Sequence, residues 1–317
     1  MRPTGPIGHD PVMIEIRNLT KCYGPTRAVD RLTVTVRPGY VTGFLGPNGA
    51  GKTTTLRLAL GLAAPSSGDV LLCGRAYVEI ERPMREVGAL LDATAIEGRR
   101  SAVDHLRWLG RSHRIAEARV THLLEQVGLG AVARRPIATF SLGMKQRLGI
   151  AAALLGDPRI LLLDEPINGL DPDGVRWIRE LLRGLAAKGG TILISSHLMS
   201  EMAITADRLV IVARGRLIAD TTVDELGHRY ARGVVVRSPE AGALARALEA
   251  AGGTLAAEPG GGWLVTGLDA TAIGRLAGQQ GVPLSELMPR GASLEEAYLQ
   301  LTAESTDHRA GTKEARP

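Results

Sequence analysis

Residues 46–53 read Gly-Pro-Asn-Gly-Ala-Gly-Lys-Thr and match the pattern G-x-x-x-x-G-K-[ST], which constrains this chain more than any other feature. The apolar run 40–45 before them has the length of a strand, and residues 54–60 after them are typical of a helix that stops near Gly61. A strand, a glycine loop and a helix N-terminus place several free backbone N–H groups and the positive end of a helix dipole around an anion. The pattern predicts a nucleotide phosphate-binding loop, in which Lys52 reaches the outer phosphates and the Thr53 hydroxyl ligates magnesium.

The composition sets the scale of the fold. The 317 residues are 44% hydrophobic, enough for one large core and a second, smaller unit, and with 3% aromatic residues these cores must be aliphatic. Cys22 and Cys73 lack metal-type spacing, so we expect reduced thiols of a cytosolic protein. The first eleven residues lack the apolar region of a secretion signal, and no window approaches the roughly 18 apolar residues of a membrane span. We therefore expect no part of the chain to cross a membrane.

The net charge of +5 raises the question of a nucleic-acid partner. The arginines are scattered, apart from short pairs such as Arg99-Arg100 and Arg134-Arg135. A nucleic-acid-binding face would gather them together and interleave aromatic residues. We expect a solvated basic surface and no nucleic-acid partner.

Hydrophobic patterns predict an α/β fold with added subdomains. Residues 12–18 and 32–36 are typical of half-exposed antiparallel strands, whereas 160–163 and 191–195 are continuously apolar, as in parallel strands buried on both faces. A helix at about 174–187 forms the crossover between the two buried strands. Residues 209–218 read as a closing β-hairpin.

Two further regions differ from this core. Between about 92 and 158 no strand pattern is strong, and the helix-like stretches 101–112 and 116–127 predict an inserted helical subdomain. Residues 229–302 predict a small α+β accessory domain, which we separate from a main domain at 12–228. Its expected strands lie at 234–236 and 263–266, and its expected helices at 240–251, 270–280 and 293–302. The polar ends, 1–11 and 303–317, are expected to be disordered.

A second motif, Ile160-Leu-Leu-Leu-Asp164-Glu165-Pro, delivers two carboxylates at the end of a buried strand. That is where α/β sheets place their chemistry. Asp164 is suited to hold magnesium, and Glu165 to polarise the water that attacks the γ-phosphate. An acidic pair that only caps the strand end is the alternative, which the phosphate loop makes less favoured.

Three other residues indicate a function only through their order along the chain. Ser141 is a good N-cap for a helix whose free N–H groups make another anion site. His197 follows a buried strand, and Tyr23 lies in a turn-like segment, so each taken alone is equally typical of a structural residue.

With these elements in this order, the chain resembles the ATP-binding-cassette ATPases, the nucleotide-binding subunits of ABC transporters, over residues 12–225. The resemblance implies a P-loop ATPase core with an antiparallel β subdomain, ATP and Mg²⁺ as cofactors, and a homodimer that hydrolyses ATP between two head-to-tail domains. It implies Glu165 and His197 as catalytic residues and Asn168–Asp171 as the loop that communicates across the dimer. The residues expected to bind the nucleotide are Tyr23, Gly46, Asn48, Gly49, Ala50, Gly51, Lys52, Thr53, Thr54 and, in the opposite subunit's site, Ser141 and Gly143.

Two positions depart from the family pattern. Leu142 replaces the first glycine of the usual S-G-G, and a positive φ there would cost energy. The glutamine that usually follows the strand before the helical subdomain is replaced, and we place Asp92 at that position. The expected metal ligands are therefore Thr53, Asp92 and Asp164.

The C-terminal segment bears on the type of transporter. Leu294, Ala297, Tyr298 and Leu301 share one helical face, and Ser293 with Glu296 makes a capping box. A similar ending closes the accessory domain of subunits that look like daunorubicin-type drug exporters; an ordinary surface helix is the alternative.

We expect an ATPase subunit at the inner face of the cell membrane that powers a separate permease, for export of a drug-like or lipophilic compound. The rival is a non-transport cassette ATPase that acts on nucleic acid or the ribosome. Such proteins usually carry two cassettes or a long coiled coil, and this chain has one phosphate loop and no sustained heptads.

Overall fold

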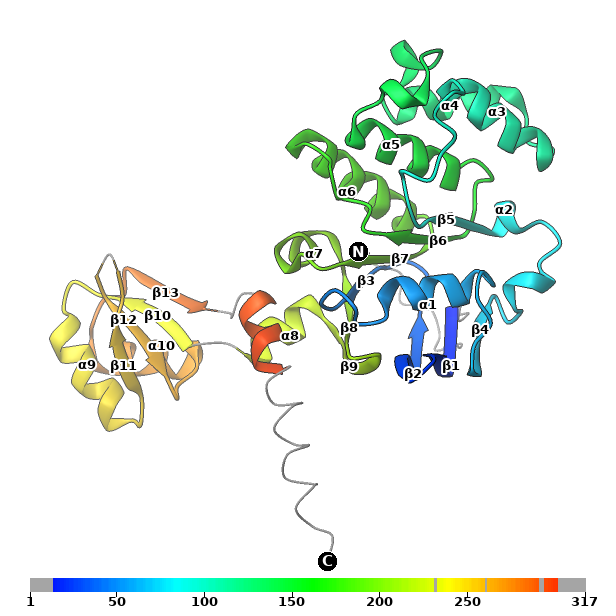
Figure 1. Cartoon of the computed structure of the whole chain (residues 1–317). Coiled ribbons are helices and arrows are strands. Elements are labelled where there is room, and N and C mark those ends of the chain that lie inside the picture. The colour runs from blue at the N-terminus through cyan, green and yellow to red at the C-terminus, as the bar shows by residue number, and fades with distance from the viewer. Residues whose placement is uncertain (1–13, 231–232, 260, 291–293, 302–317) are drawn as a thin grey trace, which may run out of the picture. The chain divides into compact units, whose positions relative to one another are not determined.

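A computed structural model describes residues 14–230, 233–259, 261–290 and 294–301 (Figure 1). The chain divides into two compact units, Met1–Thr222 and Val223–Pro317. The domain boundary expected after residue 228 lies inside helix α8 (Val223–Arg229), which belongs to the second unit. The expected disordered ends, 1–11 and 303–317, lie outside the described residues, as does Ser293 of the expected capping box.

The first unit begins with a three-stranded antiparallel sheet of order β2-β1-β4. Its strands are β1 (Ile14–Tyr23), β2 (Thr26–Val36) and β4 (Ser67–Leu72). The first two strands were predicted, and their alternating pattern buries Ile14, Ile16 and Val34 on one face. Strand β4 was missed because its first three residues, Ser67–Asp69, are exposed and not apolar, which leaves an apolar run of only three residues at this edge strand.

The central sheet has six strands in the order β5-β6-β7-β3-β8-β9, parallel except for the last. The strands are β3 (Val41–Leu45), β5 (Val87–Leu90), β6 (Ile160–Asp164), β7 (Thr191–Ser196), β8 (Arg208–Ala213) and β9 (Arg216–Thr222). Every residue of β6 and β7 is buried, as predicted, and the predicted β8–β9 hairpin is present. The helices beside this sheet are α1 (Lys52–Ala59), α2 (Pro83–Glu86), α6 (Pro172–Ala187) and α7 (Met199–Thr205).

A helical subdomain separates β5 from β6, as predicted. It consists of α3 (Ala102–Ser112), α4 (Glu117–Gln126) and α5 (Leu142–Ala153). Figure 1 shows these three helices together beyond the β5 edge of the central sheet. Short 3₁₀ turns lie at Tyr77–Glu79, Gly130–Val132 and Ile137–Thr139.

The second unit has the order β-α-β-β-α-β of a split βαβ fold, which is the small α+β architecture that the sequence predicts. Its elements are β10 (Gly233–Arg237), α9 (Ala241–Ala250), β11 (Thr254–Ala257), β12 (Trp263–Thr266), α10 (Ala270–Gln280) and β13 (Glu286–Arg290), followed by helical residues 294–301. Val236, Leu244, Val265 and Ile273 join both helices to one face of the sheet in a core of their own.

The described residues contain no helix that is both long and apolar enough to span a bilayer. Cys22 and Cys73 are half-buried thiols.

Candidate functional site

The phosphate loop joins the buried strand β3 to helix α1, as the sequence predicts. Gly51 caps the helix with φ 100°, a conformation that L side chains rarely adopt. A Cβ atom at Gly51 would lie 2.4 Å from the Ala28 carbonyl oxygen, and one at Gly46 would lie 2.4 Å from the Val212 oxygen. The loop therefore requires glycine at both positions. Its tip, from Pro47 to Gly49, is exposed to solvent.

The side chain of Lys52 folds back against the phosphate loop. Its side chain is only 6% exposed, and its Nζ donates hydrogen bonds to the carbonyls of Gly46 at 2.6 Å and Pro47 at 3.3 Å. Burial lowers the pKa of Lys52, while the nearby carboxylates of Glu165 and Asp164 oppose that shift. A buried ammonium whose described hydrogen bonds go to carbonyl oxygens is suited to exchange them for phosphate oxygens.

Thr53 and Asp164 are in contact beside this lysine, although they are 111 positions apart in the sequence. The Thr53 hydroxyl donates to Oδ2 of Asp164 at 2.5 Å, and the Ser195 hydroxyl donates to the other carboxylate oxygen, Oδ1. Asp164 is 8% exposed. A hydroxyl and a carboxylate in contact are the hard oxygen donors that suit Mg²⁺, which usually takes its remaining ligands from phosphates and water.

Glu165 follows directly after β6 and is fixed at several atoms. Its backbone N–H donates to Oγ of Ser195 at 3.0 Å, and its carbonyl accepts from Nε2 of Gln146 at 3.1 Å. Oε2 lies 3.0 Å from Nδ1 of His197, and Oε1 lies 3.9 Å from Nζ of Lys52. Its φ of 48° is uncommon for a residue with a side chain. Such a conformation at a carboxylate beside a phosphate loop points to a functional constraint.

The structure thus brings together Lys52, Thr53, Asp164, Glu165 and His197. Direct contacts among the described residues do not extend this cluster to Tyr23, Asp92, Ser141 or Gly143.

Tyr23 ends β1 and is half exposed, with Nζ of Lys21 5.0 Å from its ring centroid. Its cross-strand partner is Thr26, two residues before Ala28, whose carbonyl faces Gly51. Asp92 is exposed beyond β5, and Oδ1 accepts hydrogen bonds from the backbone and hydroxyl of Thr94 at 2.7 and 2.6 Å. These bonds lower the pKa of Asp92.

Ser141 is the N-cap of α5, as predicted, and its hydroxyl accepts from the backbone N–H of Met144 at 3.2 Å. Leu142 begins the helix with helical backbone and a half-exposed side chain, so the replacement of glycine carries no left-handed strain. Its side chain packs against Gly169, where a Cβ atom would come within 2.5 Å of Cδ2 of Leu142. Gly143 packs as closely on the Gly169 carbonyl, since a Cβ atom there would lie 2.8 Å from that oxygen.

Two residues of this site were not singled out from the sequence. Ser195 accepts from Glu165 and donates to Asp164, and Gln146 is a buried polar residue on α5. A serine at the end of a buried strand and a glutamine on the apolar side of a helix were the available signals.

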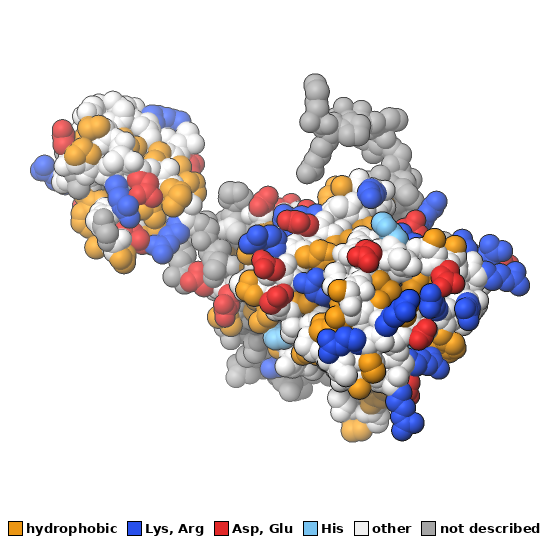
Figure 2. All heavy atoms as spheres, turned by 90° about the horizontal axis from the view of Figure 1, so that it is seen from above, with side chains coloured by type: hydrophobic (Ala, Val, Ile, Leu, Met, Phe, Trp, Pro, Cys, Tyr) orange, Lys and Arg blue, Asp and Glu red, His pale blue; other side chains and the backbone are white. Residues whose placement is uncertain are grey.

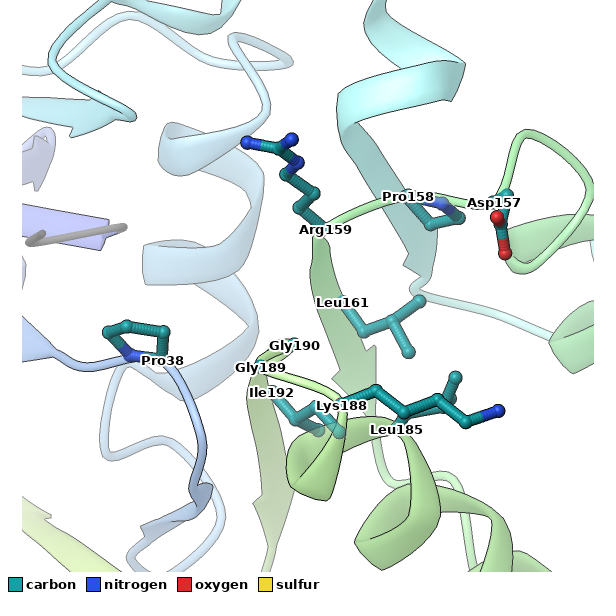
Figure 3. A pocket seen from close by; sticks show the side chains of 10 residues that line it. All are labelled: Pro38, Asp157, Pro158, Arg159, Leu161, Leu185, Lys188, Gly189, Gly190 and Ile192. Atoms are coloured by element: carbon teal, nitrogen blue, oxygen red, sulfur yellow. The ribbon is translucent and has the colours of Figure 1, made fainter. Parts of the chain in front are cut away.

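A cavity of about 420 Å³ lies elsewhere, at the N-terminal ends of β6 and β7 (Figure 3). Arg159, Leu161, Gly190 and Ile192 are among its lining residues. The candidate site lies at the opposite ends of the same strands, so this cavity is separate from it. The side chains of Arg159 and Lys188 extend away from each other and do not converge on the cavity.

Comparisons with known proteins agree with this geometry. Residues 29–168 match the family model described as ABC transporter, and residues 232–295 match a domain of unknown function (DUF8746). A lantibiotic transport ATP-binding protein of Streptococcus pyogenes is 37% identical over 212 residues, which are 67% of this chain and 92% of that protein. A bacitracin transport ATP-binding protein of Enterococcus faecalis is 41% identical over 220 residues, 68% of this chain and 71% of that protein. Among solved structures, an ATP-binding subunit of an ABC transporter matches with a TM-score of 0.63 and 28% identity, over 69% of this chain and 93% of that one.

Proposed function

Because the chain belongs to the ABC transporter family as an ATP-binding subunit, we propose that it uses Glu165 as general base in ATP hydrolysis and powers a separate membrane permease. ATP hydrolysis is general for this family, whereas the residue roles, the partners and the cargo are the proposal. The observation that carries it is the convergence of Lys52, Asp164, Glu165 and His197 beside one glycine loop.

Each residue of this cluster has a distinct task in the proposed mechanism. Lys52 exchanges its loop carbonyls for the outer phosphate oxygens, and the backbone N–H groups of the loop bind the others. Thr53 and Asp164 would hold Mg²⁺, which when bound neutralises charge on the phosphates. Glu165 accepts the proton of the attacking water, and His197 orients that carboxylate from its Oε2 side.

A homodimer would complete the site. Ser141 and Leu142 are exposed at the N-terminus of α5, and in the described residues no contact links them to the chain's own phosphate loop. A helix N-terminus attracts anions, so this end is suited to the γ-phosphate held by a second copy. Ser141 and Gly143 therefore bind the nucleotide in the partner's site in this proposal.

The partner in transport is a permease, which holds this subunit at the inner face of the cell membrane. The relatives named for lantibiotic and bacitracin transport favour export of a drug-like or lipophilic compound. The rival function on nucleic acid or the ribosome is not favoured by these relatives. On the face that Figure 2 shows, basic side chains are spread out and interspersed with acidic ones, without the continuous basic band of a nucleic-acid binder.

Co-purification tests this proposal. The tagged chain is expressed in its native host, extracted with the membranes in mild detergent and assayed for bound membrane proteins and ATP turnover. We expect the membrane protein to co-purify in stoichiometric amounts and to alter the ATPase rate. Recovery with ribosomes or DNA and no membrane protein would overturn the proposal in favour of its rival.

A further inference from the structure

We propose that Gln146 is a positioning residue for the catalytic base, because its amide fixes the backbone of Glu165 in the conformation that directs the carboxylate into the site. This inference rests on the proposed role of Glu165. Gln146 belongs to the helical subdomain, whereas Glu165 directly follows strand β6 of the central sheet, so the contact joins two parts of the first unit.

The burial of Gln146 is the first observation. It lies on α5 and is 5% exposed, among buried apolar residues of the same helix such as Leu148 and Ile150. A buried amide without a partner is costly, and an aliphatic residue would fill the same space without that cost. Nε2 of Gln146 donates to the carbonyl oxygen of Glu165 at 3.1 Å. The amide therefore has a specific target, which is the main chain of the proposed base.

The backbone of Glu165 is the second observation. Its φ of 48° lies in the left-handed region, which residues other than glycine, asparagine and aspartate rarely enter. Such a conformation persists only when its surroundings hold it. The Glu165 N–H is held by Ser195, and its carbonyl accepts from Gln146 and from the backbone N–H of Asn168 at 3.2 Å. Of these three, only Gln146 reaches Glu165 from another subdomain.

The orientation of the Glu165 carboxylate depends on this backbone conformation. Oε2 of Glu165 lies 3.0 Å from Nδ1 of His197, and rotation of the main chain about φ would move that oxygen away. Without the Gln146 donor, the Glu165 main chain keeps only its contacts with Ser195 and the Asn168 N–H among those described, so its left-handed conformation is held less firmly. Nucleotide binding should be unaffected because Lys52 and Thr53 do not contact Gln146. A shift in catalysis without a shift in affinity is the expected signature.

The test combines Gln146→Met with Glu165→Gln in a double-mutant cycle. Methionine keeps the length and approximate volume of glutamine but removes the donor. In the wild-type background, we expect Gln146→Met to lower kcat about 10-fold and to leave KM for ATP within about twofold. In the Glu165→Gln background, measured under single-turnover conditions, the same change should lower the residual rate by less than about twofold, because the base whose position matters is gone.

Controls separate this role from a general effect of replacing a helical glutamine by methionine. Gln126→Met makes the same chemical change at an exposed position on α4 and should leave kcat and KM unaltered. If Gln146→Met does not fold, as judged by its thermal unfolding, Gln146→Leu replaces it in the cycle, since leucine has no donor for the Glu165 carbonyl and buries no charge. An equal loss of rate in both backgrounds, or no loss in the wild-type background, would overturn the inference. The Glu165→Gln single variant tests the proposed function independently: if it keeps wild-type turnover, both the role of Glu165 and the inference fail.

Discussion

Nδ1 of His197 lies 3.0 Å from Oε2 of Glu165. The two residues are 32 positions apart in the sequence, and each immediately follows a buried strand, β7 and β6 respectively. The strands are parallel neighbours in which Asp164 pairs with Ser195, so their carboxyl ends bring the carboxylate and the imidazole to one edge of the sheet. The contact supports the proposed role of His197, which is to orient the Glu165 carboxylate.

If His197 orients the base, His197→Ala should lower ATP turnover by about 10²-fold and leave ATP affinity nearly unchanged. Turnover is measured by phosphate release, and affinity by titration with a fluorescent ATP analogue. His122→Ala, at an exposed position on α4, is the matched control. An equal fall of turnover in both variants would contradict the proposed role.

Gly51→Ala should weaken ATP binding by at least about 10-fold, because the added Cβ would lie 2.4 Å from the Ala28 carbonyl and displace the loop. Gly39→Ala is the control, since Gly39 also has a positive φ of 82° but no atom within 4 Å of the added Cβ. Both variants carry the left-handed cost of about 1 kcal/mol, and only Gly51→Ala carries the collision. Equal ATP affinities in calorimetric titrations of the two variants would refute the account of the loop.

Of the three expected metal ligands, Asp92 is the one whose described contacts do not link it to the cluster beside the phosphate loop, so variants of Asp92 test that assignment. Asp92→Ala should weaken magnesium-dependent hydrolysis and permease coupling but spare nucleotide binding, and Asp92→Gln should be the milder change. Hydrogen bonds from Thr94 lower the pKa of Asp92 below its ordinary value of 3.8. The stabilisation linked to this shift is therefore present above that value and is lost as the pH falls through the lowered pKa.

Asp92 consequently stays ionised from pH 6 to 8, so the Asp92→Gln variant should show the wild-type shape of the pH–rate profile over that range. The rates are measured at saturating magnesium and again at limiting magnesium. Normal transport by an Asp92→Ala subunit would show that the metal assignment is wrong.

Truncation after Thr222 should leave a folded protein that binds ATP with affinity within about twofold of the full chain. Each unit has its own hydrophobic core, and all residues of the candidate site lie in the first. We expect weaker dimerisation or transport, measured by light scattering with ATP and by transport with the permease present. Loss of ATP binding in a soluble, folded truncation would place the second unit in the site.

Much of the fold follows from local patterns in the sequence. Residues 160–163 and 191–195 are apolar without interruption because β6 and β7 are covered on both faces. Strands β4, β11 and β13 were not predicted. Most of their residues are exposed or only partly buried, so their strand conformation comes from pairing with β1, β12 and β10 and not from a hydrophobic pattern of their own.

The candidate site was also predictable from the sequence only in part. The phosphate loop and the carboxylate pair are contiguous motifs, so the sequence predicts them directly. Ser195 and Gln146 act through hydrogen bonds to residues 30 and 19 positions away, which no local pattern reveals. The left-handed backbone of Glu165 was equally hidden, since glutamate has no intrinsic preference for it.

The most direct test of the account is the turnover of purified Glu165→Gln protein compared with its affinity for ATP. Glutamine keeps the shape of the side chain but cannot accept the proton of the attacking water. We expect ATP affinity to be retained, turnover to fall by roughly 10²–10⁴-fold, and an ATP-bound dimer to accumulate in size-exclusion chromatography with light scattering. Turnover close to that of the wild type would contradict the account and remove Glu165 from the catalytic role.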